Sequence, residues 1–105
     1  MEACTNLNDA KAGQYVKVGT SRNGAKGVKA IVKVCKNGRI DMDGRKEMYV
    51  PDTDGRAAYS AGRRSGYLSN VSMIWPFAEG EAVEGVQEQM AREEQDGKSP
   101  GKDGS

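Results

Sequence analysis

Lysines, arginines and tyrosines are the residues whose types and spacing in this chain indicate a chemistry. Lys and Arg side chains neutralise phosphate groups, and tyrosine rings are platforms on which unpaired bases stack. The predicted nucleic-acid site combines two strand-like runs with a later basic segment. Its residues are Tyr15, Lys17, Lys29, Lys33, Arg56, Tyr59, Arg63, Arg64 and Tyr67. A solvated outer face with a flexible basic loop is the competing interpretation of the same residues.

The alternation of residue types is the reason to place these lysines together. Residues 28–34 alternate with period two, which is typical of a strand with one face in a core. The pattern predicts that Lys29, Ile31 and Lys33 share the outer face. Residues 15–18 repeat it, with their valines facing inward and their tyrosine and lysine facing outward. We therefore expect an open, basic, tyrosine-bearing wall.

The chain lacks the residues that several other chemistries require. The chain has no histidine, the commonest general base and metal ligand, and its two cysteines cannot form a four-thiolate zinc site. The Asp-x-Asp-Gly sequences at 41–44 and 52–55 lack the remaining calcium ligands and are expected to be turns. The loop at 19–27 lacks the Gly-Lys-Ser/Thr of a phosphate-binding loop. We expect no catalytic residues, no metal and no cofactor, and hence no enzyme.

Short strands and tight turns must position the predicted site. The chain has 14 glycines and is 36% hydrophobic, which favours a small β domain with a thin core. Asn-Gly and Asp-Gly pairs mark its turns. We predict an all-β fold, a small five-stranded antiparallel barrel or strongly curved sheet. The expected strands are 14–18, 28–36, 39–42, 46–50 and 71–75.

Charge and composition divide the chain into three parts. Residues 1–12 are expected to form a flexible polar arm, residues 13–78 the barrel, and residues 79–105 an acidic tail. Residues 1–78 hold thirteen basic and seven acidic residues, a net of +6, while residues 79–105 hold three and eight, a net of −5.

Two of these parts have further predicted features. The segment 56–66 is small, basic and glycine-containing, and is expected to be a mobile loop. Apolar spacing in 79–94 predicts a short helix, followed by disorder from residue 96. The acidic tail could fold back on the basic face and compete with nucleic acid.

The sequences Val16-Lys17-Val18 and KGVKAIV at 26–32 resemble the KOW motif of small Src-homology-3-like barrels. The resemblance covers about a fifth of the chain, and Ala30 stands where that family has its second glycine. It implies a barrel fold, together with RNA binding or docking onto a larger machine such as a ribosome or RNA polymerase.

A second function rests on apolar residues that could be exposed. Such a surface would make the protein a small inhibitor or adaptor of the type that phages and plasmids encode against a host nuclease or polymerase. In a chain with so few aromatic residues, Trp75 and Phe77 are more often core residues than interface residues. The residues of this docking surface are Ile31, Trp75, Phe77, Val83, Val86 and Met90.

The expected compartment follows from what the sequence lacks. The N-terminus has neither the basic start nor the apolar run of a signal peptide, and no stretch approaches the length of a membrane span. We therefore expect a cytoplasmic protein with reduced cysteines, no membrane association and an undetermined oligomeric state.

Overall fold

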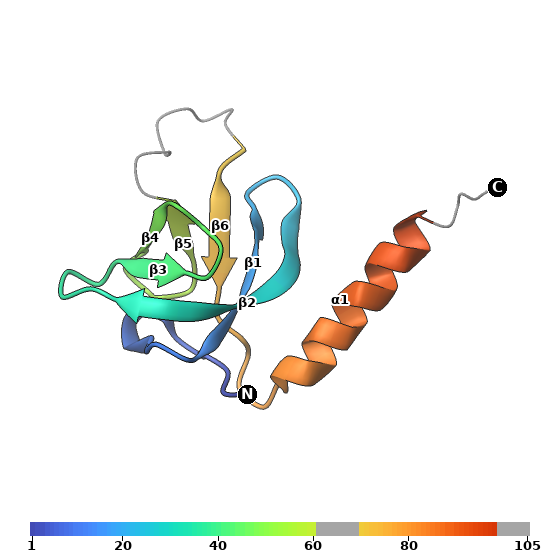
Figure 1. The fold of residues 1–105 in the computed structure, drawn as a ribbon, viewed down its shortest axis with the longest axis horizontal. Helices are drawn as coiled ribbons and strands as arrows, with labels where there is room; N and C mark the ends of the chain where they lie inside the picture. Colours follow the sequence, from blue (N-terminus) through green and yellow to red (C-terminus); the bar gives the residue numbers. More distant parts are fainter. Residues whose placement is uncertain (61–69, 99–105) are drawn as a thin grey trace.

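The chain forms a closed, six-stranded antiparallel barrel with a helix beside it (Figure 1). This computed structural model describes residues 1–60 and 70–98, and the side chains of residues 94–98 also lie outside the description. The strand order is β1-β2-β3-β4-β5-β6, with every strand antiparallel to its neighbours. The elements are η1 Leu7–Asp9, β1 Tyr15–Thr20, β2 Gly24–Val34, β3 Ile40–Met42, β4 Met48–Pro51, β5 Ala58–Ser60, β6 Ser72–Trp75 and α1 Val83–Lys98.

The small all-β barrel and the C-terminal helix are confirmed, but five strands were predicted and six are present. The additional strand is β5, which lies in the segment expected to be a mobile loop. It pairs with β4 through Val50↔Tyr59 and with β6 through Ala58↔Ile74. Pairing on both sides closes the barrel, so this strand owes its structure to its partners.

The hairpin between β1 and β2 is tighter than the expected loop at 19–27. Both strands extend toward each other, and only residues 21–23 separate them. Gly24 has a φ of 76°, a conformation that glycine adopts readily. Gly19 lies at a register shift where an added methyl group would collide with the Gly24 carbonyl. Close backbone packing therefore fixes this hairpin.

The N-terminal segment is part of the barrel, which corrects the prediction of a flexible arm at 1–12. Cys4 and Leu7 are 1% and 2% exposed. The Cys4 amide donates to the Tyr15 carbonyl at 2.9 Å, and the Phe77 amide donates to the Cys4 carbonyl at 2.7 Å. The barrel core consists of Cys4, Leu7, Val16, Val18, Ile31, Ile40, Met42, Tyr49, Ala58 and Ile74.

Helix α1 covers part of the outer surface of β1 and β2. Phe77, Val83 and Val86 are buried together and pack against Tyr15 and Val28. The helix extends to Lys98, which corrects the predicted disorder for residues 96–98; the rest of that predicted tail, 99–105, lies outside the described residues. The outer face of the first hairpin is therefore a second small core.

Candidate functional site

Tyr15 and Lys17 face outward as predicted, but the chain itself occupies their surroundings. Tyr15 packs against the apolar cluster under α1. The Lys17 ammonium donates to the Glu81 carboxylate at 3.0 Å and lies 5.3 Å from the centre of the Phe77 ring. The Lys17 side chain is only 21% exposed. Its charge is compensated within the molecule, so Lys17 is a poor phosphate ligand.

The three lysines of the predicted wall do not share a face, which corrects the sequence-based geometry. Lys17 pairs with Val28 across β1 and β2, whereas Lys29 pairs with Val16, whose side chain is in the core. Directly paired residues of antiparallel strands point to the same side of a sheet. Lys29 therefore lies on the opposite side from Lys17, and its ammonium reaches the β3–β4 turn at Gly44.

Ile31 also departs from the prediction, because it is 2% exposed and belongs to the barrel core. A register irregularity between Ile31 and Lys33 interrupts the alternation of β2. As a result Val32 and Lys33 are both exposed. Lys33 thus points to solvent. It lies far along the chain from Lys17, the lysine of β1, and does not form a common surface with it.

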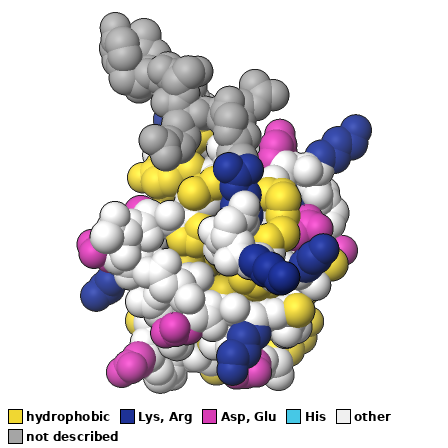
Figure 2. Space-filling view, turned by 90° about the vertical axis from the view of Figure 1, so that its left-hand side faces the viewer, with side chains coloured by type: hydrophobic (Ala, Val, Ile, Leu, Met, Phe, Trp, Pro, Cys, Tyr) yellow, Lys and Arg dark blue, Asp and Glu magenta, His cyan; other side chains and the backbone are white. Residues whose placement is uncertain are grey.

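A different group of cations is exposed around the short strand β3. We call it the hairpin face, and it consists of Lys33, Lys36, Arg39 and Lys46. None of the four forms an ion pair with a described residue. Figure 2 shows this side of the molecule, where Lys and Arg side chains project around a partly exposed hydrophobic surface. Val32, at 53% exposure, adds to the apolar area of the same strand segment.

Turn chemistry holds the hairpin face in place. Gly38 has a φ of 87°, and the Cys35 amide donates to the Arg39 carbonyl at 2.9 Å. The Asn37 side chain accepts from the Arg39 amide at 3.1 Å. The β3–β4 turn likewise has a left-handed glycine, Gly44, at a φ of 75°. The three residues of β3 span about 10 Å, so the two turns that carry these cations lie close together.

The charges of the chain are separated in space as well as in sequence. Residues 28–48 carry six Lys or Arg and three Asp or Glu, a net of +3. Residues 79–93 carry one Arg and five Glu, a net of −4. Figure 1 shows β3 and the β2–β3 hairpin on one side of the barrel and α1 on the other. The acidic helix therefore does not neutralise the hairpin face.

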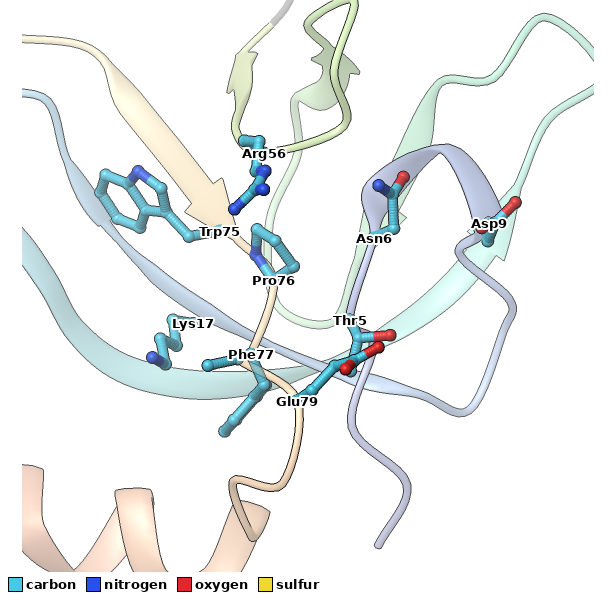
Figure 3. A pocket seen from close by; sticks show the side chains of 10 residues that line it. Thr5, Asn6, Asp9, Lys17, Arg56, Trp75, Pro76, Phe77 and Glu79 are labelled. Carbon is cyan, nitrogen blue, oxygen red and sulfur yellow. The ribbon is translucent and has the colours of Figure 1, made fainter.

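Arg56 lines a surface pocket of about 700 Å³ near the end of β6. Figure 3 shows Arg56 and Trp75 on one side of this pocket, with Thr5 and Glu79 across from them. Trp75 was not in the predicted site, although its alternation with the buried Ile74 signals that its ring faces outward. The full lining is Thr5, Asn6, Asp9, Lys17, Arg56, Trp75, Pro76, Phe77, Ala78 and Glu79.

The remaining predicted site residues are not brought together. Tyr59 is half-buried in β5 and pairs with Val50 and Met73. Arg63, Arg64 and Tyr67 lie outside the described residues.

The apolar docking surface predicted from the sequence is largely consumed by folding. Ile31 is in the barrel core, and Phe77, Val83 and Val86 are buried between α1 and the barrel. Met90 is partly buried against that same cluster. Of the predicted surface, Trp75 keeps an accessible side chain through its position in the pocket.

One carboxylate, that of Glu81, and one thiol, that of Cys4, have environments that shift their pKa values. The pKa of Glu81 is lowered because its carboxylate accepts from the Ala78 amide at 2.7 Å and from the Lys17 ammonium. Burial raises the pKa of the Cys4 thiol, which donates to the Asn6 carbonyl. Both cysteines are free, and Cys35 is half-buried.

Within the described part of the chain, no three His, Cys, Asp or Glu side chains gather as metal ligands would. The helices of residues 1–60 and 70–98 fall short of the length and apolarity that a membrane crossing requires. Comparisons with protein-family models, curated proteins and solved structures found no significant match to this chain.

Proposed function

We propose that the protein is a non-enzymatic accessory protein that binds RNA or single-stranded DNA through its hairpin face. The observation that supports this function most is a set of four exposed cations on the β2–β3 hairpin and the adjacent turn, none of which is ion-paired with a described residue. Such groups bind phosphates by releasing condensed counterions, which makes affinity strongly salt-dependent. Histidine is absent from the sequence, so the commonest acid–base group is unavailable.

The opposite charge of α1 supports one orientation of binding. A molecule with a basic side and an acidic side turns its basic side toward a polyanion during approach. The hairpin face would then contact the strand while the helix points away from it. Sequence preference is expected to be weak at this face, because the described residues form no basic helix that could enter a major groove. The KOW resemblance agrees with RNA as the ligand.

Fluorescence anisotropy of a labelled single strand at two salt concentrations tests the proposal. With four phosphate contacts on a single strand, log affinity should fall with log salt at a slope of about −3. The dissociation constant should therefore rise about 50-fold between 50 and 200 mM salt. A triple variant with Lys33, Lys36 and Arg39 replaced by Ala should bind weakly, with a slope near −0.7.

A matched control removes three cations elsewhere. Lys11, Lys26 and Arg92 are exposed and lie outside the hairpin face. Replacing them with Ala changes the net charge equally, and should leave most of the affinity intact. Equal losses in both triple variants would mean that only net charge matters, and would refute the hairpin face as the site.

The alternative function, a small inhibitor or adaptor of a host protein, has less support. The apolar surface on which it rested is mostly buried in this chain. If neither RNA nor DNA binds at 50 mM salt, the alternative would be preferred, and affinity capture from the source cell would be the next experiment.

A further inference from the structure

The pocket beside β6 is separate from the hairpin face and combines an aromatic ring with a cation. It lies where the N-terminal segment, the turn before β5 and the end of β6 meet (Figure 3). Its volume of about 700 Å³ falls within the range of sites that hold small-molecule ligands.

Trp75 places an indole at one edge of the pocket (Figure 3). Its register partner on β1 is Lys17, which places the indole on the outer surface of the barrel. The side chain is half-buried, and the chain turns away at Pro76, which also lines the pocket. An indole held in this way is a stacking surface for a base.

Arg56 is the cation that is available in the pocket. The turn before it is fixed, because Gly55 has a φ of 70° and the Arg56 amide donates to the Asp52 side chain at 3.1 Å. The guanidinium is exposed and has no ion-pair partner among the described residues. Lys17, the other lining cation, is already engaged by Glu81. A single phosphate is therefore expected at Arg56.

Two carboxylates, Asp9 and Glu79, make one side of the pocket negatively charged. Both are exposed, and in Figure 3 they lie across the pocket from Trp75 and Arg56. They repel a second phosphate but accept hydrogen bonds from N–H groups. A ligand with a phosphate at one end and N–H donors at the other matches this arrangement.

We propose that the pocket holds one unpaired nucleotide, with its base on Trp75, its phosphate on Arg56 and the N–H edge of its base toward Glu79. This inference rests on the proposed function and adds a base-reading subsite to it. Adenine, cytosine and guanine each carry an exocyclic amino group that can donate to a carboxylate. Uracil instead has two carbonyl oxygens beside its single edge N–H, so it should bind most weakly.

The fluorescence of Trp75, the only tryptophan in the chain, tests the inference. The protein is titrated with AMP, CMP, GMP and UMP, with excitation at the red edge so that tyrosines do not contribute and with correction for nucleotide absorbance. Stacking should quench the emission saturably, with UMP the weakest ligand. Arg56→Ala should weaken all four nucleotides about tenfold or more, while Glu79→Gln should mainly reduce the discrimination against UMP.

Glu84→Gln is the matched control, because Glu84 is an exposed helix carboxylate outside the pocket lining. It should behave as the unaltered protein does. Absence of quenching, or equal quenching by all four nucleotides in every variant, would overturn the inference.

Failure of the subsite and failure of the proposed function give different results. Binding of strands of about 12 nucleotides with steep salt dependence, but without nucleotide quenching, would remove the subsite and leave the hairpin face. Nucleotide quenching without binding of these strands would instead refute the proposed function, and with it the assignment of the pocket to a bound strand.

Discussion

Replacing Leu7 with Ala should destabilise the barrel as strongly as a substitution in a central strand. Leu7 is 2% exposed and packs in the main core, although it lies in a polar segment outside the strands. Its amide also donates to the Gly55 carbonyl at 2.9 Å, which ties the segment to the turn before β5. The side chain therefore fills space that no strand residue fills.

The magnitude follows from burial. Removing a fully buried leucine side chain costs its transfer free energy plus that of the cavity, about 3 kcal/mol in a core that relaxes partially. For a domain of about 100 residues, this corresponds to a fall in Tm of roughly 10–20 °C. Such a loss is a large part of the stability of a small domain.

Urea unfolding followed by tryptophan fluorescence measures the effect as a lower midpoint at an unchanged m value. Val32→Ala is the matched control, since it also shortens an aliphatic side chain, but one that is 53% exposed. The control should change the free energy of unfolding by less than about 0.5 kcal/mol. A comparably small change for Leu7→Ala would refute the conclusion that the N-terminal segment belongs to the core.

Three further predictions concern the first hairpin, the thiols and the helix. Gly19→Ala should cost at least about 1–3 kcal/mol in thermal unfolding, because the added methyl group meets the backbone of β2 rather than a movable side chain; an unchanged Tm would contradict this. A thiol reagent should label half-buried Cys35 first. Cys4 is buried and has a raised pKa, so it should react only as fast as the N-terminal segment unfolds locally. Equal labelling rates for the two thiols would contradict the burial of Cys4. Glu81→Gln should lower stability by less than about 1 kcal/mol at neutral pH, because the lowered pKa reflects an ionised carboxylate held by Lys17. That difference should vanish as pH falls below about 4.5 through the depressed pKa, and its persistence in acid would show that charge is not its cause.

Turns were the best predicted part of the fold, because their chemistry is local. The Asn-Gly and Asp-Gly pairs at residues 37, 43 and 54 fall where Gly38, Gly44 and Gly55 adopt φ values of 87°, 75° and 70°. These conformations depend on neighbouring residues alone. Strands beside such turns were therefore placed to within a few residues.

Elements that depend on distant partners were not predictable. Strand β5 has three residues and exists because β4 and β6 pair with both of its edges. The N-terminal segment buries Cys4 and Leu7, which pack with strand residues in the barrel core. Neither segment has a hydrophobic periodicity long enough to predict its structure.

The predicted basic wall failed for a related reason. Alternation of residue types reveals the two faces of a strand. It does not reveal which face lies in the barrel core when both faces pack against other parts of the chain. Val28 and Ala30 point to the outer face, where α1 provides apolar contacts to Val28, so Lys29 and Ile31 take the inner side. The irregularity before Lys33 then changes the alternation again.

The map of backbone amide signals perturbed by a short single-stranded RNA tests the central claim most directly. The proposed function predicts salt-sensitive shifts concentrated in residues 32–46, while the signals of α1 beyond its contact with the barrel stay unchanged. Shifts centred on α1, or no shifts at low salt, would contradict nucleic-acid binding by the hairpin face.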